Sequence, residues 1–325
     1  MSKFKILVWA LGLASLGAAG PCLAWGPEGH TIVARVAANA LQGQAASDLN
    51  WIITTGVPAL NAQMQQAYGN KCQIDPADPW GPVPNPTTDK DQHTNLANWA
   101  DCYRYQDAST SGWHFNDIPL GQTPTGALDA ASQPWCPTAK SCISLALADN
   151  LRKLATPNQA PADAARALAY VVHFMGDLHQ PLHEEDNGDI GGNEVLITTK
   201  GAGVSATKLH ALWDTPLVQA ALGKSLDKAT STLAADVANA DAPSNVDTVD
   251  EVIASSDRWA EDTHALASPA YSQLHIAVGA GKQQGVPVSK AYVKLESQVV
   301  RTQLVLSAIR LKAALGAALT WSPPS

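Results

Sequence analysis

His173-Phe-Met-Gly-Asp177-Leu-His179-Gln-Pro181-Leu-His183 is the most informative stretch of this chain. His173 and Asp177 are four residues apart, so on a helix both side chains project from one face. Pro181 then stops the helix, and His183 follows in the turn, where it can reach a neighbouring part of the fold. Nitrogen and oxygen ligands at this density are typical of zinc sites, and a central carboxylate can bridge two ions. The stretch therefore predicts a multi-zinc enzyme.

Helical patterns extend from this stretch in both directions. The predicted helices cover residues 27–42, 47–54 with Ser47 as the cap, 91–105, 141–155, 162–180, 207–221 and 288–318, with further helical segments through 227–280. Pro-rich connections run over 75–86 and 116–137. The one strand candidate, Glu194–Thr199, is followed by Gly201-Ala-Gly203, which predicts one small β-hairpin. Ala-rich helices joined by Pro-rich loops predict one compact, mainly α, multi-helix domain over residues 25–325.

The first 24 residues have the pattern of a secretory signal. Lys3 and Lys5 precede an apolar run over residues 6–19, and Ala24 is a small residue before the predicted cut. A lipoprotein anchor at Cys22 is the competing interpretation, which the preceding Gly-Pro pair disfavours. No later stretch is apolar for long enough to span a bilayer. The sequence thus predicts an exported protein, secreted or periplasmic, with no membrane anchoring.

The charge of the chain limits how it can hold phosphate. The full chain has a formal net charge of −8, and removal of the two lysines of the signal brings it to about −10. Affinity for nucleic acid usually comes from a basic surface. A phosphate-cleaving enzyme with this acidic balance needs metal ions to supply a local positive field.

Four cysteines remain after the predicted cut: Cys72, Cys102, Cys136 and Cys142. An even number in an exported protein predicts two disulfides, for which three connectivities exist. The short loop favours Cys136 with Cys142, which leaves Cys72 with Cys102. A zinc–thiolate site is the alternative, but these spacings match no common cysteine cluster.

Further candidate ligands lie outside the opening stretch. His210 and Asp214 repeat the four-residue spacing just before a proline. Asp101 lies in a predicted helix, and Arg104 follows one turn later on the same face. His114 sits between a helix and a long loop. Together with the opening stretch, these positions make an accidental clustering of ligand types improbable.

The predicted cut would create a ligand of its own at Trp25. The freed α-amino group has an ordinary pKa near 8, so a metal displaces its proton at modest cost. The amine and the carbonyl oxygen of Trp25 can close a five-membered chelate ring, and His30 follows five residues later. An uncut precursor is expected to lack this ion.

Most single histidines and tryptophans are structural. His93, His264 and His275 are left unassigned on that ground, and His179, on another helix face from His173, is interpreted as structural or as a support for a ligand. Three tryptophans close to candidate ligands are equally consistent with core packing beneath a site: Trp99, Trp113 and Trp213.

The chain resembles the zinc-dependent single-strand nucleases, the S1/P1-type family of mung bean nuclease and its fungal and bacterial relatives. The resemblance rests on motifs that occur in one order along nearly the whole mature chain: Trp25-Gly-x-x-Gly-His30, Trp99-Ala-Asp101, Trp113-His-Phe115, the 173–183 stretch, Gly191-Gly-Asn193 and His210-x-x-Trp-Asp214.

The resemblance implies a mainly helical fold with three zinc ions in a cleft. It implies that the first zinc is held by Asp101, His114, His173 and Asp177; the second by the amine and carbonyl of Trp25, His30 and the other oxygen of Asp177; and the third by His183, His210 and Asp214. The bridging role of Asp177 agrees with the spacing argument made from the residues themselves.

The implied reaction is metal-assisted attack of water on phosphorus, leaving 5′-phosphates. Asp101, Arg104 and Asp177 are the expected catalytic residues, with Arg104 holding a phosphate oxygen; a structural salt bridge is the alternative for Arg104. The expected partners are single-stranded DNA and RNA and nucleotides, with no obligate protein partner. The side chains expected to contact a base are Phe115 by stacking, Asp117 and Asn193, although Phe115 also suits simple core packing.

Two other functions compete with the nuclease. A zinc phospholipase C resembles this family in fold and ligand order, but typically ends its ligand set with Glu where this chain has Asp214. A non-catalytic zinc-binding protein would have no need of Arg104. Removal of 3′-phosphates from nucleotides is an expected second activity of the leading hypothesis.

Overall fold

The mainly α prediction is confirmed. The computed structural model describes residues 25–83, 93–122, 135–136, 142–242 and 246–321, so the predicted signal over 1–24 lies outside the described residues. The helices are α1 (Gly26–Asn39), α2 (Gly43–Trp51), α3 (Val57–Tyr68), α4 (Trp99–Tyr103), α5 (Ile143–Leu154), α6 (Pro161–Asp177), α7 (Leu209–Asp214), α8 (Pro216–Leu222), α9 (Leu226–Asn239), α10 (Val249–His264), α11 (Ala267–Ser272) and α12 (Lys290–Ala318). The strands are β1 (Gln73–Ile74), β2 (His93–Thr94), β3 (Val195–Thr198) and β4 (Gln283–Pro287).

Helix α6 lies at the centre of the fold and carries the first part of the opening stretch. Of its 17 residues, 14 are buried, as expected for a helix that is surrounded by protein. It packs against α1, α3, α4, α5 and α12. Pro161 occupies its first position, where the backbone N–H that proline lacks would have no partner within the helix. The helix ends shortly before Pro181. His173 and Asp177 are thereby placed in its buried last turns.

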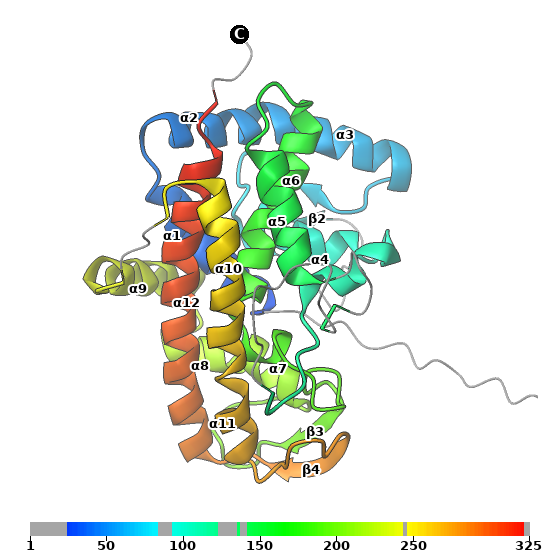
Figure 1. Cartoon of the computed structure of the whole chain (residues 1–325), viewed down its shortest axis with the longest axis vertical. Coiled ribbons are helices and arrows are strands. Elements are labelled where there is room, and N and C mark those ends of the chain that lie inside the picture. Colours follow the sequence, from blue (N-terminus) through cyan, green and yellow to red (C-terminus); the bar gives the residue numbers. More distant parts are fainter. Residues whose placement is uncertain (1–24, 84–92, 123–134, 137–141, 243–245, 322–325) are drawn as a thin grey trace, which may run out of the picture.

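The long helix α12 forms one side of the molecule. It runs along the long axis beside α10, while α2 and α3 lie across one end and the β3–β4 sheet lies at the other (Figure 1). It packs against α1, α8, α9 and α10. The buried apolar side chains form one cluster that includes Trp25, Trp99 and Trp213, so these tryptophans are core residues. Among the described residues, no helix is long and apolar enough to cross a membrane.

The second predicted helix has the wrong start. Helix α2 already begins at Gly43, and the Ser47 hydroxyl donates to the Gly43 carbonyl at 3.2 Å instead of capping an N-terminus. Such back-bonding to the preceding turn is a common alternative use of serine. The helical backbone also continues beyond Thr54, because a π-helical turn at Ile52–Gly56 leads directly into α3.

Two other predicted helices are interrupted. The helix expected over 207–221 is divided into α7 and α8 at Thr215, because Pro216 cannot continue the hydrogen bonding of the preceding turn. The helix expected over 91–105 is shorter in the structure. A 3₁₀ turn at Leu96–Asn98 precedes α4, and His93–Thr94 belongs to a strand.

The strand predicted at Glu194–Thr199 is present, but its sheet partner is not the one expected. Strand β3 pairs in parallel with β4 in the register Val195–Gln283 to Thr198–Pro287, so the paired residues are 88 or 89 positions apart in the sequence. The return after Gly201 makes only an isolated antiparallel bridge between Leu196 and Lys208. The sequence of β4 was not recognisable as a strand, because Gln-Gln-Gly-Val-Pro has a single β-branched residue. Strands β1 and β2 form a second, short parallel pair.

Both expected disulfides are present. Cys72 is bonded to Cys102, with a sequence separation of 30, and Cys136 is bonded to Cys142, with a separation of 6. The first bond joins the segment before β1 to helix α4. It therefore fixes the helix on which Asp101 lies.

Candidate metal centre

Three buried groups of histidines and aspartates lie around the end of α6. They are His30 with His173 and Asp177; Asp101 with His114 and His173; and His183 with His210 and Asp214. Within each group, the candidate ligand atoms lie within 4.8 Å of one another. The structure thus brings together every side chain that the sequence predicted as a metal ligand, from five segments of the chain.

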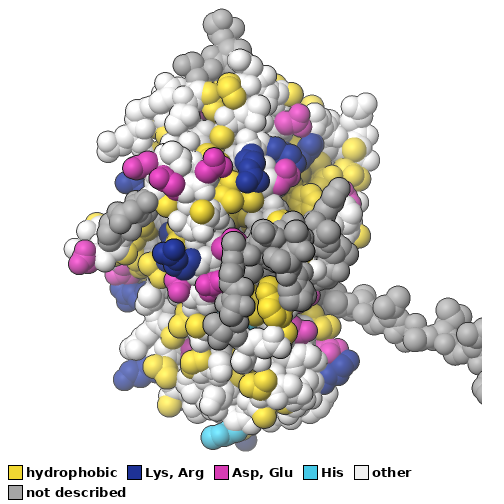
Figure 2. Space-filling view, viewed as in Figure 1, with side chains coloured by type: hydrophobic (Ala, Val, Ile, Leu, Met, Phe, Trp, Pro, Cys, Tyr) yellow, Lys and Arg dark blue, Asp and Glu magenta, His cyan; other side chains and the backbone are white. Residues whose placement is uncertain are grey.

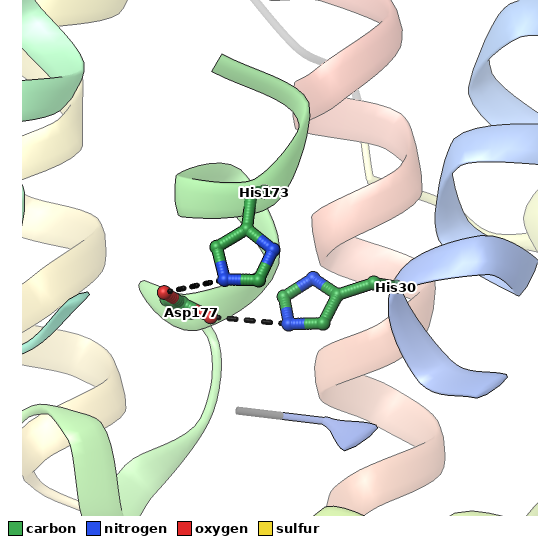
Figure 3. Close-up of side chains that lie close together, drawn as sticks. All are labelled: His30, His173 and Asp177. Atoms are coloured by element: carbon green, nitrogen blue, oxygen red, sulfur yellow. Dashed lines mark ion pairs between the residues drawn. The ribbon is translucent and has the colours of Figure 1, made fainter. Parts of the chain in front are cut away.

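Asp177 turns its two carboxylate oxygens toward two different histidines, His30 and His173 (Figure 3). Its Oδ1 is 3.1 Å from Nε2 of His30, which projects from α1, and its Oδ2 is 3.3 Å from Nε2 of His173. The two imidazole rings are stacked, with centroids 4.0 Å apart. Because the two carboxylate oxygens face different histidines, Asp177 has the geometry of a bridging ligand.

The second group adds residues from α4 and from the 3₁₀ segment Ala108–His114. Nδ1 of His114 is 3.0 Å from Oδ2 of Asp177 and 3.7 Å from Oδ1 of Asp101. Nε2 of His173 is 3.6 Å from the same oxygen of Asp101. Both oxygens of Asp101 are buried without a hydrogen-bond partner, although the guanidinium of Arg104 lies 3.2 Å from Oδ1, so both oxygens remain able to ligate a metal ion.

The third group carries the clearest sign of a cation. Nε2 of His183 lies 3.1 Å from Nε2 of His210. The Nδ1 atoms of the two rings lie 2.6 Å from the His114 carbonyl and 2.5 Å from the Gly191 carbonyl, so both Nδ1 atoms must donate. In neutral rings, both Nε2 atoms then carry lone pairs that point at each other. A metal ion bound by both rings removes this repulsion, and Asp214 completes the group at 3.6 Å from His210.

Burial favours the neutral form of four of the histidine rings, those of His30, His114, His173 and His183. Loss of solvent lowers the pKa of His30 to about 4 and lowers the pKa of His114, His173 and His183, with neighbouring cationic groups adding to the shift for His114 and His183. Burial also raises the pKa of Asp177. Neutral imidazoles have free lone pairs at neutral pH, and a bound metal would offset the cost of ionising Asp177. The donor set therefore fits a nitrogen- and oxygen-binding metal such as zinc.

Backbone carbonyls and one amide side chain orient the ligands. Nδ1 of His173 lies 2.8 Å from the Ala97 carbonyl, the same arrangement as in His183 and His210. Gln180 donates to Oδ1 of Asp214 at 3.0 Å while its own oxygen accepts from the Leu182 N–H. Sequence reasoning missed these partners. Carbonyls have no signature in the sequence, and Gln180 was passed over although it lies inside the opening stretch.

Trp25 and His30 are held close together at the start of α1. Trp25 is fully buried, and its carbonyl accepts the Gly29 N–H at 3.1 Å. Both residues pack against Gly176 of α6, where a Cβ would come within 2.5 Å of the His30 ring. A glycine is therefore needed at position 176 for α1 to approach the metal centre.

Arg104 is buried beside the centre and forms a salt bridge. Its guanidinium lies 3.2 Å from Oδ1 of Asp101, and only 7% of its side chain is exposed. The structure therefore contains the ion pair with an aspartate that was the alternative role for Arg104. The same geometry leaves the guanidinium next to a candidate metal ligand.

A small cavity lies beside the third group. Phe115 and Asp117 line it together with His183 and His210. Burial and the nearby charge of Asp186 raise the pKa of Asp117 to about 6. The described residues that line the cavity do not include Asn193, whose side-chain amide donates to the Ile190 carbonyl at 2.9 Å.

Of the four histidines outside the predicted ligand set, two are buried with hydrogen-bond partners and two are exposed. Buried His179 lies 2.7 Å from the Met175 carbonyl through Nδ1, and Arg310 donates to its Nε2 at 2.9 Å, which agrees with a structural role. His264 is also buried and lies 2.8 Å from two carbonyl oxygens. His93 and His275 are exposed.

Comparison with known proteins identifies one protein family and several relatives of this chain. The family model described as S1/P1 nuclease matches residues 25–320. Nuclease S1 of Aspergillus oryzae is 36% identical over 129 residues, which cover 40% of this chain and 43% of that protein. Nuclease P1 of Penicillium citrinum is 29% identical over 182 residues, or 53% of this chain and 66% of that protein. The matches thus span less than two thirds of either fungal protein. Endonuclease 1 of Arabidopsis thaliana is 23% identical over 94% of this chain and 90% of its own length.

Proposed function

The chain belongs to the S1/P1 nuclease family, and we propose that it is an exported endonuclease that uses three zinc ions to cleave single-stranded DNA and RNA. The observation that carries the proposal is the pair of opposed Nε2 atoms of His183 and His210, whose Nδ1 atoms must both donate to carbonyls. A metal ion between the rings would satisfy that arrangement, and two further ligand groups lie next to it.

We assign the ligands as the sequence predicted. One zinc would be bound by Asp101, His114, His173 and Asp177; one by Trp25, His30 and Asp177; and one by His183, His210 and Asp214. The distances to both oxygens of Asp177 support its role as the bridge. All of these residues come from one chain, so the proposed chemistry needs no protein partner.

Bound zinc would supply Lewis acidity and would lower the pKa of a coordinated water. The residues around it have distinct tasks. Arg104, held by Asp101 at 3.2 Å, would donate to a non-bridging phosphate oxygen as charge develops in the transition state. The buried position of Arg104 excludes much of the water that would otherwise weaken this interaction. Cleavage is expected to leave a 5′-phosphate.

Selection for single strands would come from the cavity beside the third group. This cavity, of about 30 Å³, is too small to enclose a base. A base would instead stack on the exposed part of the half-buried Phe115 ring, a contact typically worth about 1–3 kcal/mol, while Asp117 would bind the base edge. Bases of an intact duplex are stacked and paired, so they reach such a position only at an energetic cost. Asn193, the other side chain expected to contact the base edge, lies outside the described lining of this cavity.

The charges on the visible face of the molecule are mixed (Figure 2). The face in Figure 2 carries acidic and basic side chains interspersed, and the net charge of the chain is −8. We therefore propose that the metal ions and Arg104 provide most of the local positive field. Removal of 3′-phosphates from nucleotides would use the same centre. Export to the periplasm or the exterior, after cleavage of residues 1–24, agrees with the two disulfides.

The metal content of the mature protein tests the proposal directly. Mass spectrometry of the intact protein should find close to three zinc ions per chain. Chelation should abolish hydrolysis of single-stranded DNA, and the products formed before chelation should carry 5′-phosphates. Three zincs without nucleic-acid hydrolysis would redirect the search to phospholipids. One zinc or none would show that the ligand assignment is wrong.

A further inference from the structure

A second cleft lies away from the three metal-ligand groups. It has a volume of about 490 Å³, within the range of small-molecule sites. Its walls come from α4, the 3₁₀ segment Ala108–His114, the end of α5 and the first half of α6. It shares no lining residue with the cavity of Phe115 and Asp117.

One wall of this cleft is aromatic. The rings of Trp113 and Tyr170 lie 5.3 Å apart, and Tyr103 meets Tyr170 edge-on at 6.5 Å. Trp99 stacks on Tyr103 at 4.6 Å from below and fixes its orientation. Trp113 and Tyr103 are only half-buried, so part of each ring faces the cleft. Rigid, partly exposed rings of this kind are platforms on which a base can stack.

The other lining residues offer polar groups of two kinds. Asn150 is 3% exposed and donates its amide to the Ala146 carbonyl at 2.8 Å, so its side-chain oxygen remains able to accept from a ligand N–H. Lys153 and Arg166 lie at the margin. Lys153 pairs with Asp149 between exposed side chains, and Arg166, about one third exposed, pairs with Asp163 and donates to Gln63 at 2.7 Å. Ion pairs in such solvated positions are weak, so a phosphate could compete with these partners for both cations, against the charge of Asp107 and Asp163 in the cleft lining.

From this combination we propose that the cleft binds one nucleotide, with its base against Trp113 and Tyr103 and its phosphate between Lys153 and Arg166. The inference rests on the proposed function, which makes nucleotides available both as parts of the bound strand and as products. The aromatic wall and the buried acceptor suit a base, whose ring faces stack and whose edge carries N–H donors. The two cations suit the phosphate.

The position of the cleft connects it to the metal centre. Tyr103 precedes Arg104, Trp113 precedes His114, and Tyr170 lies one turn before His173 on α6. A nucleotide in the cleft would therefore contact the reverse side of the segments that hold two metal ligands and the proposed phosphate-binding arginine. Binding there would either anchor a flanking part of the strand or retain a product.

Equilibrium binding of 2′-deoxyadenosine 5′-monophosphate to the zinc-loaded mature protein tests the proposal. This probe has no phosphodiester bond or 3′-phosphate to hydrolyse. Calorimetry should find two equivalents bound, one at the metal centre and one in the cleft. The double variant Lys153→Gln/Arg166→Gln should weaken one of them by about tenfold or more, the expected effect of losing charge-assisted hydrogen bonds.

The matched control is Arg152→Gln/Lys228→Gln, which removes the same charge from exposed positions outside the cleft and should leave both equivalents unchanged. A single equivalent in the natural protein would overturn the proposal, and so would equal binding by both double variants. The binding measurement needs no turnover, so it tests the cleft separately from the proposed function. If the natural protein had no nuclease activity but the Lys153→Gln/Arg166→Gln variant still lost one bound equivalent, the proposed function would be contradicted and the cleft assignment would stand.

Kinetics then separate the two sources of the nucleotide. If the cleft anchors the strand, the Lys153→Gln/Arg166→Gln variant should show a raised KM for a long single-stranded DNA and an unchanged KM for a dinucleotide. If the cleft retains a product, both KM values should stay unchanged and inhibition by the monophosphate should weaken. Unchanged KM values and unchanged inhibition would count against the proposal.

Discussion

At the scale of single residues, one carboxylate faces two of the proposed metal positions. The spacing of His173 and Asp177 predicted that both face one side of a helix, and the structure shows one oxygen of Asp177 toward His30 and the other toward His173. The sequence could not show that three ligand histidines are oriented by the carbonyls of Ala97, His114 and Gly191. A carbonyl is present at every residue, so only the folded geometry identifies those that matter.

Replacing the bridge should cost more metal than replacing an end ligand. Asp177→Asn removes a charge shared by two proposed positions, whereas Asp214→Asn affects one. We expect zinc content to fall from three to about one in the first variant and to about two in the second. Hydrolysis of single-stranded DNA should fall by more than about a hundredfold in each. Asp149→Asn, at an exposed position, is the control. Equal zinc loss in the Asp177 and Asp214 variants would contradict a bridging role.

Arg104 tests whether the centre is catalytic. Arg104→Lys keeps a positive charge beside Asp101 but loses the forked geometry that grips a phosphate. We expect kcat to fall by about 10²–10³, the typical cost of losing a donor to transition-state charge, with zinc content unchanged. Steady-state kinetics on single-stranded DNA and metal analysis provide the two readouts. Unchanged turnover would leave Arg104 with only the structural ion pair that it makes with Asp101.

Glu296 should make stability depend on pH. It is 2% exposed on α12 and accepts from the Gln273 amide at 2.6 Å, and burial raises its pKa to about 7. At a pH between the ordinary pKa of 4.5 and about 7, the Glu296 carboxyl is ionised in the unfolded chain and still protonated in the folded chain. The free energy of unfolding contributed by Glu296 therefore falls as pH rises through this window.

The variant Glu296→Gln cannot ionise and should escape this loss. Its melting temperature should exceed that of the natural protein at pH 8, and the difference should shrink toward pH 5.5. Comparing the two proteins at each pH removes the effect of metal release, which both share. A difference that is constant across this range, or larger at the acidic end, would contradict the assigned pKa.

At the scale of elements, long periodic segments were predictable and their interruptions were not. Helices α6 and α12 lie close to their predicted ranges because each shows a sustained helical pattern. Strand β4 was missed because its residues have low strand propensity and its partner β3 lies far away in the sequence. Ser47 was misassigned as a cap because its hydroxyl bonds a carbonyl within the helix, an alternative that the residue type allows equally well.

The disulfide at α4 should stabilise the fold more than the other one. In the loop-entropy model, closing the 30-residue separation of Cys72 and Cys102 contributes about 3–4 kcal/mol, against about 2 kcal/mol for the 6-residue separation of Cys136 and Cys142. Paired Cys→Ser variants measured by urea unfolding should show this order. The Cys72/Cys102 variant should also lose zinc more readily, because Cys102 adjoins Asp101. The reverse order of stability would contradict this account.

At the scale of the whole molecule, the fold collects ligands from segments that are distant in the sequence. α1 supplies His30, α4 supplies Asp101, and the end of α6 with the following turn supplies three more, while α7 closes the group with His210 and Asp214. The order of the motifs was visible in the sequence, but their convergence depends on α1, α4 and α7 all lying around the end of α6. That arrangement follows from packing across the one core cluster, which a single sequence does not reveal.

The start of the mature chain should control whether the whole centre assembles. Trp25 is fully buried beside His30 at the beginning of α1. A free α-amino group there has an ordinary pKa near 8 and can lose its proton to a metal, whereas a peptide nitrogen cannot ligate in the same way. A protein beginning at Trp25 should therefore bind three zinc ions, and one that retains Ala24 should bind two and lose single-strand hydrolysis. Both proteins can be released from the same removable tag, so that they differ by one residue. Three zincs in the longer protein would show that the second ion does not depend on the terminal amine.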